Sequence, residues 1–130
     1  MKKNKILAAA LLCAASLAFV GCSKKADNGK KSGSDFHIGI VTGTVSQSED
    51  DLRGAEELIH RYGAVKDGGM IQHITYPDDF MSQQETTISQ IVALADDPLM
   101  KAVIVNAAVP GTAEAFKRIK EKHRNCLCLR

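Results

Sequence analysis

Small polar residues follow three short apolar runs in this chain, and they are its best candidates for chemistry. The predicted ligand-binding residues are Thr42, Gly43, Thr44, Ser46, Asn106, Ala107, Val109, Gly111 and Thr112. The middle run is followed by Tyr76, Pro77 and Asp78. Hydroxyl groups, an amide and free helix N-termini suit the binding of a small polar or anionic solute. The alternative is structural, because Thr, Ser, Asn and Gly are also the ordinary residues of caps and turns.

The usual catalytic and nucleotide-binding motifs do not occur in the sequence. Gly39 and Gly43 do not form G-x-G-x-x-G, and neither G-x-x-x-x-G-K-[ST] nor G-x-S-x-G is present. The acid pairs Asp50–Asp51 and Asp78–Asp79 could serve as paired carboxylates. We interpret them instead as residues that favour a helix N-terminus and a turn. We therefore expect no catalytic residue and no cofactor, and an enzyme on such a sheet is the less favoured alternative.

Histidine and cysteine residues lack the spacing of a metal site. The four histidines are scattered: His37, His60, His73 and His123. We interpret each as a surface or strand-face residue. Cys126 and Cys128 follow the last of them, but a second pair of ligands is missing. Two cysteines two positions apart on an extended strand are also poorly placed to bridge each other. We expect neither a metal site nor a disulfide framework here.

Three βα units are predicted to position the polar residues. Apolar, β-branched runs predict strands at Phe36–Thr42, Met70–Thr75 and Ala102–Asn106. A helix is expected from about Ser48 to Tyr62, ending at Gly63. Its predicted apolar face is Leu52, Ala55, Ile59 and Tyr62, widened by Leu58.

Two further helices follow the second and third strands. Ser82–Glu85 matches a capping box, and the apolar stripe behind it is Ile88, Ile91, Val92 and Ala95. Thr112 is expected to cap the third helix, which would bury Phe116 and Ile119.

Right-handed crossovers predict a parallel, Rossmann-like α/β sheet of strand order 2-1-3. A fourth strand is expected beside the third, beginning at Cys126–Leu129. Ligands bind such sheets where neighbouring crossovers diverge, here between strands one and three. A fold of this type needs further elements after the fourth strand, so we expect residues 36–130 to be an incomplete lobe, truncated within a domain.

The charge balance gives no reason to expect nucleic acid as a partner. The chain has 17 Lys and Arg against 15 Asp and Glu, and three of the lysines lie in the first 21 residues, which hold no acid. The remainder therefore carries 14 basic and 15 acidic residues, a net charge of −1. Phosphate binding needs a clustered basic surface instead.

The N-terminus has the pattern of a targeting signal. Lysines precede an apolar run at Ile6–Val20, which suits a signal peptide and is short for a membrane span. The sequence Val20-Gly21-Cys22 resembles the lipobox of bacterial lipoproteins, in which the cysteine is lipidated by chains such as palmitate. We predict a lipoprotein signal peptide at 1–21 with a signal helix, and lipidation at Cys22. The alternative is an ordinary secretory signal followed by an incidental cysteine.

Residues 22–35 are predicted to be a flexible tether, since they hold lysine, glycine and serine and no large aliphatic residue. A lipid, a tether and a domain form the layout of a protein on the extracytoplasmic face of the cell membrane.

Three longer stretches resemble a family of bacterial lipoproteins that is similar to the type I periplasmic solute-binding proteins. They are "FHIGIVTGTVSQSEDDLRGAEELI", "GGMIQHITYPDDFMSQQETTISQI" and "VIVNAAVPGTAEAFKRIKEK". The resemblance covers about Phe36 to Lys122. It implies two α/β lobes that close on a ligand at a hinge, beside an ABC permease. The matching positions for the ligand are the strand-end loops, chiefly Thr42–Thr44 and Asn106–Thr112.

Together these patterns predict a membrane-anchored, extracytoplasmic solute-binding lipoprotein, or a fragment of one, in an ABC-type uptake or sensing system. The alternative is a non-binding surface lipoprotein or an inactive fragment. The sequence does not identify the solute.

Overall fold

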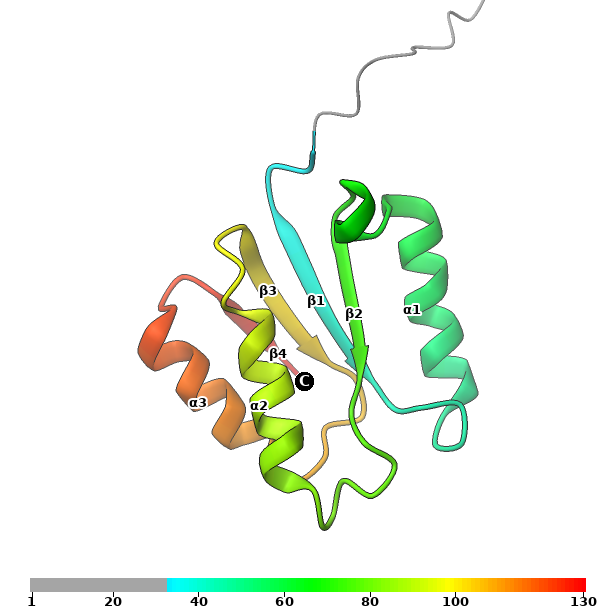
Figure 1. Ribbon diagram of the computed structural model, residues 1–130, viewed down its shortest axis with the longest axis vertical. Helices are drawn as coiled ribbons and strands as arrows, with labels where there is room; N and C mark the ends of the chain where they lie inside the picture. The colour runs from blue at the N-terminus through cyan, green and yellow to red at the C-terminus, as the bar shows by residue number, and fades with distance from the viewer. Residues whose placement is uncertain (1–32) are drawn as a thin grey trace, which may run out of the picture.

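The computed structural model describes residues 33–130 (Figure 1). Its elements, in chain order, are β1 (His37–Thr42), α1 (Glu49–Tyr62), a 3₁₀ turn η1 (Val65–Asp67), β2 (Ile71–Thr75), α2 (Gln84–Leu94), β3 (Met100–Val105), α3 (Thr112–Lys122) and β4 (Leu127–Leu129). The predicted signal peptide, the lipidation site Cys22 and all but the last three residues of the predicted tether lie outside this range. No helix within residues 33–130 has both the length and the apolar character needed to span a bilayer.

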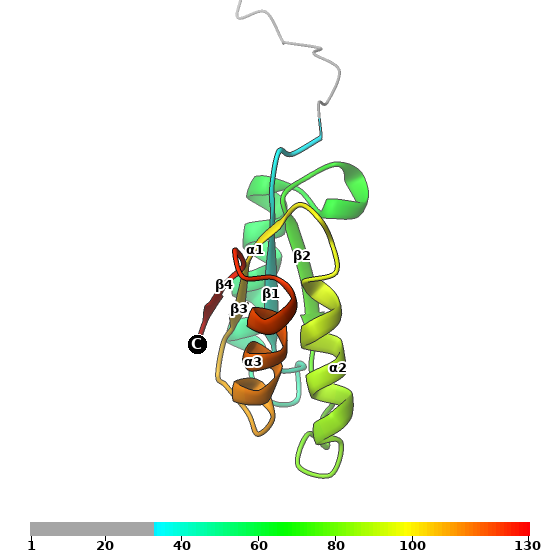
Figure 2. The ribbon, with the colours of Figure 1, turned by 90° about the vertical axis from the view of Figure 1, so that its left-hand side faces the viewer.

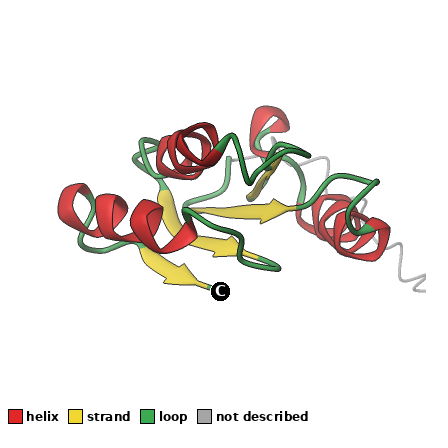
Figure 3. Cartoon of the chain, turned by 90° about the horizontal axis from the view of Figure 1, so that it is seen from below, coloured by secondary structure: helices red, strands yellow, loops and turns green. Residues whose placement is uncertain are grey.

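The four strands form one parallel sheet in the order β2-β1-β3-β4. This confirms the predicted fold class, the strand order and the place of the fourth strand. Helix α1 covers one face of the sheet, and α2 and α3 cover the other (Figures 2 and 3). The arrangement follows from right-handed crossovers, because β1 connects to a strand on one side of it while β2 must cross to the other side.

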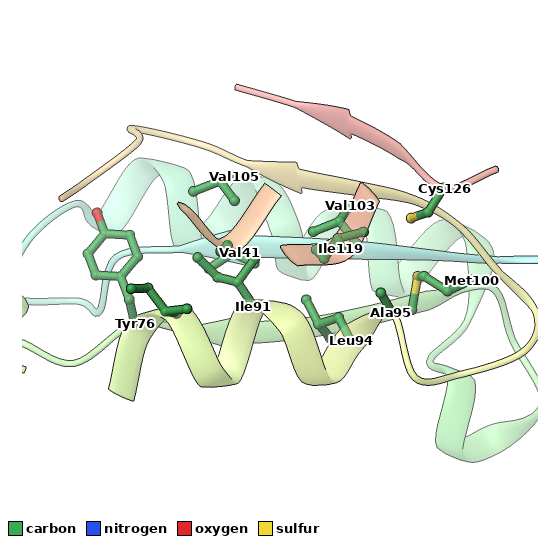
Figure 4. Close-up of a cluster of buried hydrophobic side chains, with 12 residues drawn as sticks. Val41, Tyr76, Ile91, Leu94, Ala95, Met100, Val103, Val105, Ile119 and Cys126 are labelled. Carbon is green, nitrogen blue, oxygen red and sulfur yellow. The ribbon is translucent and has the colours of Figure 1, made fainter. Parts of the chain in front are cut away.

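The larger core lies between the sheet and helices α2 and α3 (Figure 4). Its fully buried side chains include Val41, Val103, Val105, Ile91, Leu94 and Ile119. Val103 and Val105 alternate along β3, and Ile91 and Leu94 lie one helical turn apart on α2, so each of these elements turns one apolar face inward. Burying one such side chain contributes about 1.5–3 kcal/mol. This core fixes the relative positions of the strand ends.

The smaller core lies under α1 and involves only β1 and β2. Its buried members are Ile40, Ala55 and Ile71. The apolar face predicted for α1 is thus only partly buried, since Tyr62 is 53% exposed. The reason is position: α1 packs against β1 and β2 alone, and Ala55 is the residue of this helix that the contact fully buries.

Two predicted helix caps are wrong. Helix α2 starts after Gln83 with no side-chain cap, because the Ser82 hydroxyl donates to the Asp79 carboxylate instead. Helix α3 is preceded by Gly111 with φ 95°, which leaves Thr112 as its first residue. Both errors concern how the chain enters a helix, which the preceding loop decides. The predicted end of α1 at Gly63 is confirmed: its φ of 79° suits glycine.

Candidate functional site

The carboxyl ends of β1, β2 and β3 meet at one edge of the sheet, as predicted for parallel strands. The Tyr76 amide donates to the Thr42 carbonyl over 3.1 Å, and the Asn106 amide donates to the Val41 carbonyl over 2.9 Å. The three following loops therefore start side by side. Since α1 and α3 lie on opposite faces, the crossovers diverge between β1 and β3, the position at which such sheets bind ligands.

The loop after β1 is fastened to the loop after β2 by one carboxylate. Asp78 accepts hydrogen bonds from the Thr44 hydroxyl and, over 2.6 Å, from the Ser46 hydroxyl. These bonds, from Ser46 first and then Thr44, hold the pKa of Asp78 below its ordinary value. The predicted ligand groups Thr44 and Ser46 are thus brought together, but their hydroxyls already have a partner.

Gln47 adds a second fastening between the same loops. Its side-chain nitrogen donates to the carbonyls of Pro77 and Asp78, over 3.3 and 3.0 Å. Its side-chain oxygen accepts from the Thr44 amide over 3.3 Å. We call Asp78 and Gln47, with the groups they bind, the loop clasp. Gly43 lies against Gln47, and an added Cβ would stand 2.7 Å from the Gln47 side-chain oxygen, so a larger residue there would force the Gln47 side chain to move.

Thr42 is almost fully buried and serves the structure. Its hydroxyl donates to the Gly43 carbonyl over 2.8 Å and lies 2.9 Å from Nε2 of His73. Because the hydroxyl has one hydrogen, which is already used, Nε2 of His73 must be the donor. Nε2 of His73 therefore carries a proton. Burial lowers the pKa of His73, which favours the neutral form of the ring.

The loop between β3 and α3 keeps polar groups without protein partners. Asn106 is exposed, and its side-chain amide, unlike its backbone N–H, has no hydrogen-bond partner within residues 33–130. Ala107 follows with φ 52°, a backbone conformation that few residues other than glycine adopt. Val109 is half-buried, and its carbonyl accepts from the Thr112 amide over 3.1 Å.

Thr112 holds the most unusual polar atom of this edge. The residue is 2% exposed, and its hydroxyl has no hydrogen-bond partner within residues 33–130. Gly111 before it supplies no capping side chain, so the first amides of α3 are not capped from there. An unpaired buried hydroxyl costs about 1–3 kcal/mol, and such an atom calls for an explanation.

The structure thus divides the predicted residues into two groups. Around β1, Thr42, Thr44 and Ser46 are engaged with protein partners. On the β3 side, Asn106 and Thr112 carry polar side-chain groups that no residue of the described part of the chain pairs with. Gln47 and His73 belong to the same edge and were not among the predicted site residues. No sequence pattern indicates them, because their partners lie 30 and 31 positions away.

No cluster of side chains within residues 33–130 has the chemistry of a metal site. No three His, Cys, Asp or Glu side chains gather there. Cys126 and Cys128 are free thiols, and burial raises the pKa of both, which keeps them protonated and weak as ligands.

Comparisons with known proteins give a family and a fold neighbour. Residues 36–130 match the family described as "Protein of unknown function (DUF3798)". A relative from Treponema pallidum (strain Nichols), described as "Uncharacterized protein", is 46% identical over 101 residues, which are 76% of this chain and 46% of the relative. A crystal structure from Clostridium difficile 630, of a protein described provisionally as a transcriptional regulator, matches with a TM-score of 0.63 and 26% identity. That match covers 72% of this chain and 28% of the other, so this chain spans less than half the length of both proteins.

Proposed function

This chain belongs to the DUF3798 family, and we propose that it binds a small polar solute where β1 and β3 end, as all or part of a membrane-anchored, extracytoplasmic solute-binding protein. The observation that carries the proposal is the unpartnered hydroxyl of Thr112. A bound solute that reaches this hydroxyl would supply its missing hydrogen bond and so gain affinity at a place where the protein alone is destabilised.

The surrounding groups indicate the class of solute. Asn106 offers both a donor and an acceptor, and the uncapped amides at the start of α3 favour an oxygen that carries negative charge. A sugar, a carboxylate or a phosphate would satisfy these groups, whereas an apolar ligand would leave them unpaired.

The anchoring and the partner are inferred from the sequence. Val20-Gly21-Cys22 supports a lipid on Cys22, and residues 22–35 would tether the domain to the extracytoplasmic face of the membrane. The resemblance to type I periplasmic solute-binding proteins makes an ABC permease the proposed partner. The competing role is that of a surface lipoprotein that binds no solute.

The description of the Clostridium difficile protein offers regulation of transcription as a second candidate. Against contact with DNA by this chain, residues 22–130 carry a net charge of −1. Binding of a solute at this sheet edge is compatible both with a membrane-anchored binding protein and with a regulator of transcription.

A thermal-shift screen of the full chain against sugars, amino acids, carboxylates and inorganic phosphate would test solute binding. Any stabilising solute is then titrated by calorimetry into the Asn106→Ala variant. We expect at least a tenfold loss of affinity, since one hydrogen bond to a buried polar ligand is worth about 1–3 kcal/mol, and little change in Tm.

Asn125→Ala is the matched control, because Asn125 is also exposed but lies after α3, at the far end of that helix. Unchanged affinity in Asn106→Ala would remove Asn106 from the site. The absence of any stabilising solute would favour the non-binding alternative.

A further inference from the structure

Strand β4 leaves one edge of the sheet open. It pairs with β3 through Ala102–Leu127 and Ile104–Leu129, and within residues 33–130 no strand pairs with its other side. Its outward backbone groups are therefore unpaired, and an open strand edge is a template for a further strand.

One face of this part of the sheet is apolar and uncovered. Leu127 is 53% exposed and Leu129 is 45% exposed, and their partners on β3, Ala102 and Ile104, are only half-buried. Helix α1, which covers this face elsewhere, packs over β1 and β2 (Figure 3). Four neighbouring apolar side chains thus lack a covering element in the described part of the chain.

The opposite face carries an open groove of about 610 Å³ between α3 and β4. The residues that line it are Phe116, Lys117, Lys120, Glu121, Arg124 and Cys128. Phe116 and Cys128 belong to the edge of the larger core, so the floor of the groove is apolar. Three cations against one acid make its rim basic.

We propose that this end of the sheet, with its open edge, its exposed leucines and its basic groove, is a docking surface for a polypeptide that adds one helix and one strand. An amphipathic helix with acidic residues would lie in the groove, and an apolar strand would pair with β4. Side chains of the same polypeptide would cover Leu127 and Leu129. A single polypeptide of this chemistry would contact the open edge, the exposed leucines and the basic groove.

Two observations favour this occupant. The basic rim of Lys117, Lys120 and Arg124 is complementary to an acidic helix. In addition, more than half of the Treponema relative and nearly three quarters of the Clostridium difficile chain lie outside the matched stretches, so further polypeptide accompanies this fold in both. A second copy of this chain is disfavoured, because a sheet continued across two β4 edges would place two basic α3 helices on the same face.

Hydrogen exchange at β4 tests the proposal. The probe is the part of the Treponema relative outside the matched stretch, produced as a separate polypeptide and added to the full chain. We expect exchange at the amides of Leu127–Leu129 to slow at least tenfold. Replacing both leucines (Leu127→Lys with Leu129→Lys) should abolish this protection. Leu58→Lys, a change at a leucine 38% exposed on α1, should leave it intact.

The groove is tested separately by charge reversal. Lys117→Glu with Lys120→Glu should weaken binding of the same polypeptide at least tenfold, and the loss should shrink at high salt. Lys66→Glu, on η1 at the opposite end of the sheet, is the control. Three results would overturn the proposal: no protection of β4 by the added polypeptide, equal effects of test and control variants, or protection that appears with rising concentration of the chain alone, which would assign the surface to a second copy.

Discussion

The Thr112 hydroxyl is expected to affect solute binding without contributing to the stability of the fold. Its hydroxyl is buried and has no hydrogen-bond partner among residues 33–130, so its removal breaks no hydrogen bond of the described structure. We expect Thr112→Val to leave the free energy of unfolding unchanged or to raise it by up to about 1 kcal/mol. The same change should weaken solute binding at least tenfold. Urea denaturation and calorimetric titration measure the two effects.

Thr42→Val is the matched comparison, because this hydroxyl bonds both the Gly43 carbonyl and His73. Its loss should lower the free energy of unfolding by about 1–3 kcal/mol. If Thr112→Val destabilises the protein as much as Thr42→Val does, Thr112 has a structural role and the solute-binding proposal loses its main support.

His73 should make stability depend on pH. Burial lowers its pKa in the folded chain below the ordinary value of 6.5, so at mildly acidic pH the unfolded chain binds a proton that the folded chain does not. The free energy of unfolding should therefore fall as the pH drops below about 6.5, with a slope of at most about 1.4 kcal/mol per pH unit.

His73→Gln should remove this part of the slope between pH 7 and 5, as measured by urea denaturation across the range. His60→Gln, at an exposed position on α1, is the control and should keep it. Asp97 affects stability at a lower pH than His73 does. Although burial opposes it, the hydrogen bond to His37 lowers the pKa of Asp97, so its stabilisation is lost only as the pH falls below about 3.8. If the pH dependence of stability between pH 7 and 5 is the same in His73→Gln as in the unchanged protein, His73 is not its source.

At the scale of elements, the loop clasp joins two βα units beyond the end of the sheet, where the backbone bonds of β1 and β2 and the Thr42–His73 hydrogen bond no longer reach. Gln47→Ala removes two hydrogen bonds to the loop after β2 and one to the Thr44 amide. We expect the free energy of unfolding to fall by about 1–2 kcal/mol and amide exchange in residues 43–47 to accelerate. Gln90→Ala, at an exposed glutamine on α2, should do neither. Equal effects of the two changes would show that the clasp contributes no stability.

The elements themselves were predictable, because each has a strong local pattern. The β-branched runs of β1 and β3 and the apolar spacing of α2 depend on neighbouring residues, and right-handed crossovers then determine the strand order. The N-cap residues of α2 and α3 were not predictable. Gln83 and Gly111 occupy these positions because of the path of the preceding loop.

The site was predictable only in part. That three strand ends converge follows from parallel pairing, so the place could be predicted. The sequence could not predict which polar groups remain free to bind a ligand. The Thr44 and Ser46 hydroxyls donate to the Asp78 carboxylate, which lies 34 and 32 positions away in the chain. Short-range patterns contain no information on such pairs. Thr112 was expected to cap α3, but Gly111 occupies the N-cap position and offers no side chain.

At the scale of the whole molecule, the proposed role depends on attachment to a membrane. We expect Cys22→Ala to release the protein from the membrane fraction of a bacterium that expresses it, because the lipidated sulfur would be lost. Fractionation followed by immunoblotting measures this. The matched control is Cys13→Ala, at a cysteine within the predicted signal peptide, which should stay in the membrane fraction. A Cys22→Ala protein that remains acylated and membrane-bound would refute the lipobox prediction.

The central position of β1 has a consequence in time. The strand that is synthesised first lies in the middle of the sheet, and its neighbours are residues that appear much later: Ile38 pairs with Ile71 and with Ala102, 33 and 64 positions further on. At roughly 10 residues per second of synthesis, β1 waits about 6 s before both partners exist. Its apolar, β-branched stretch stays unpaired throughout that interval. Nascent chains of this protein therefore expose an unpaired apolar strand during synthesis, a state that favours aggregation before the sheet can form.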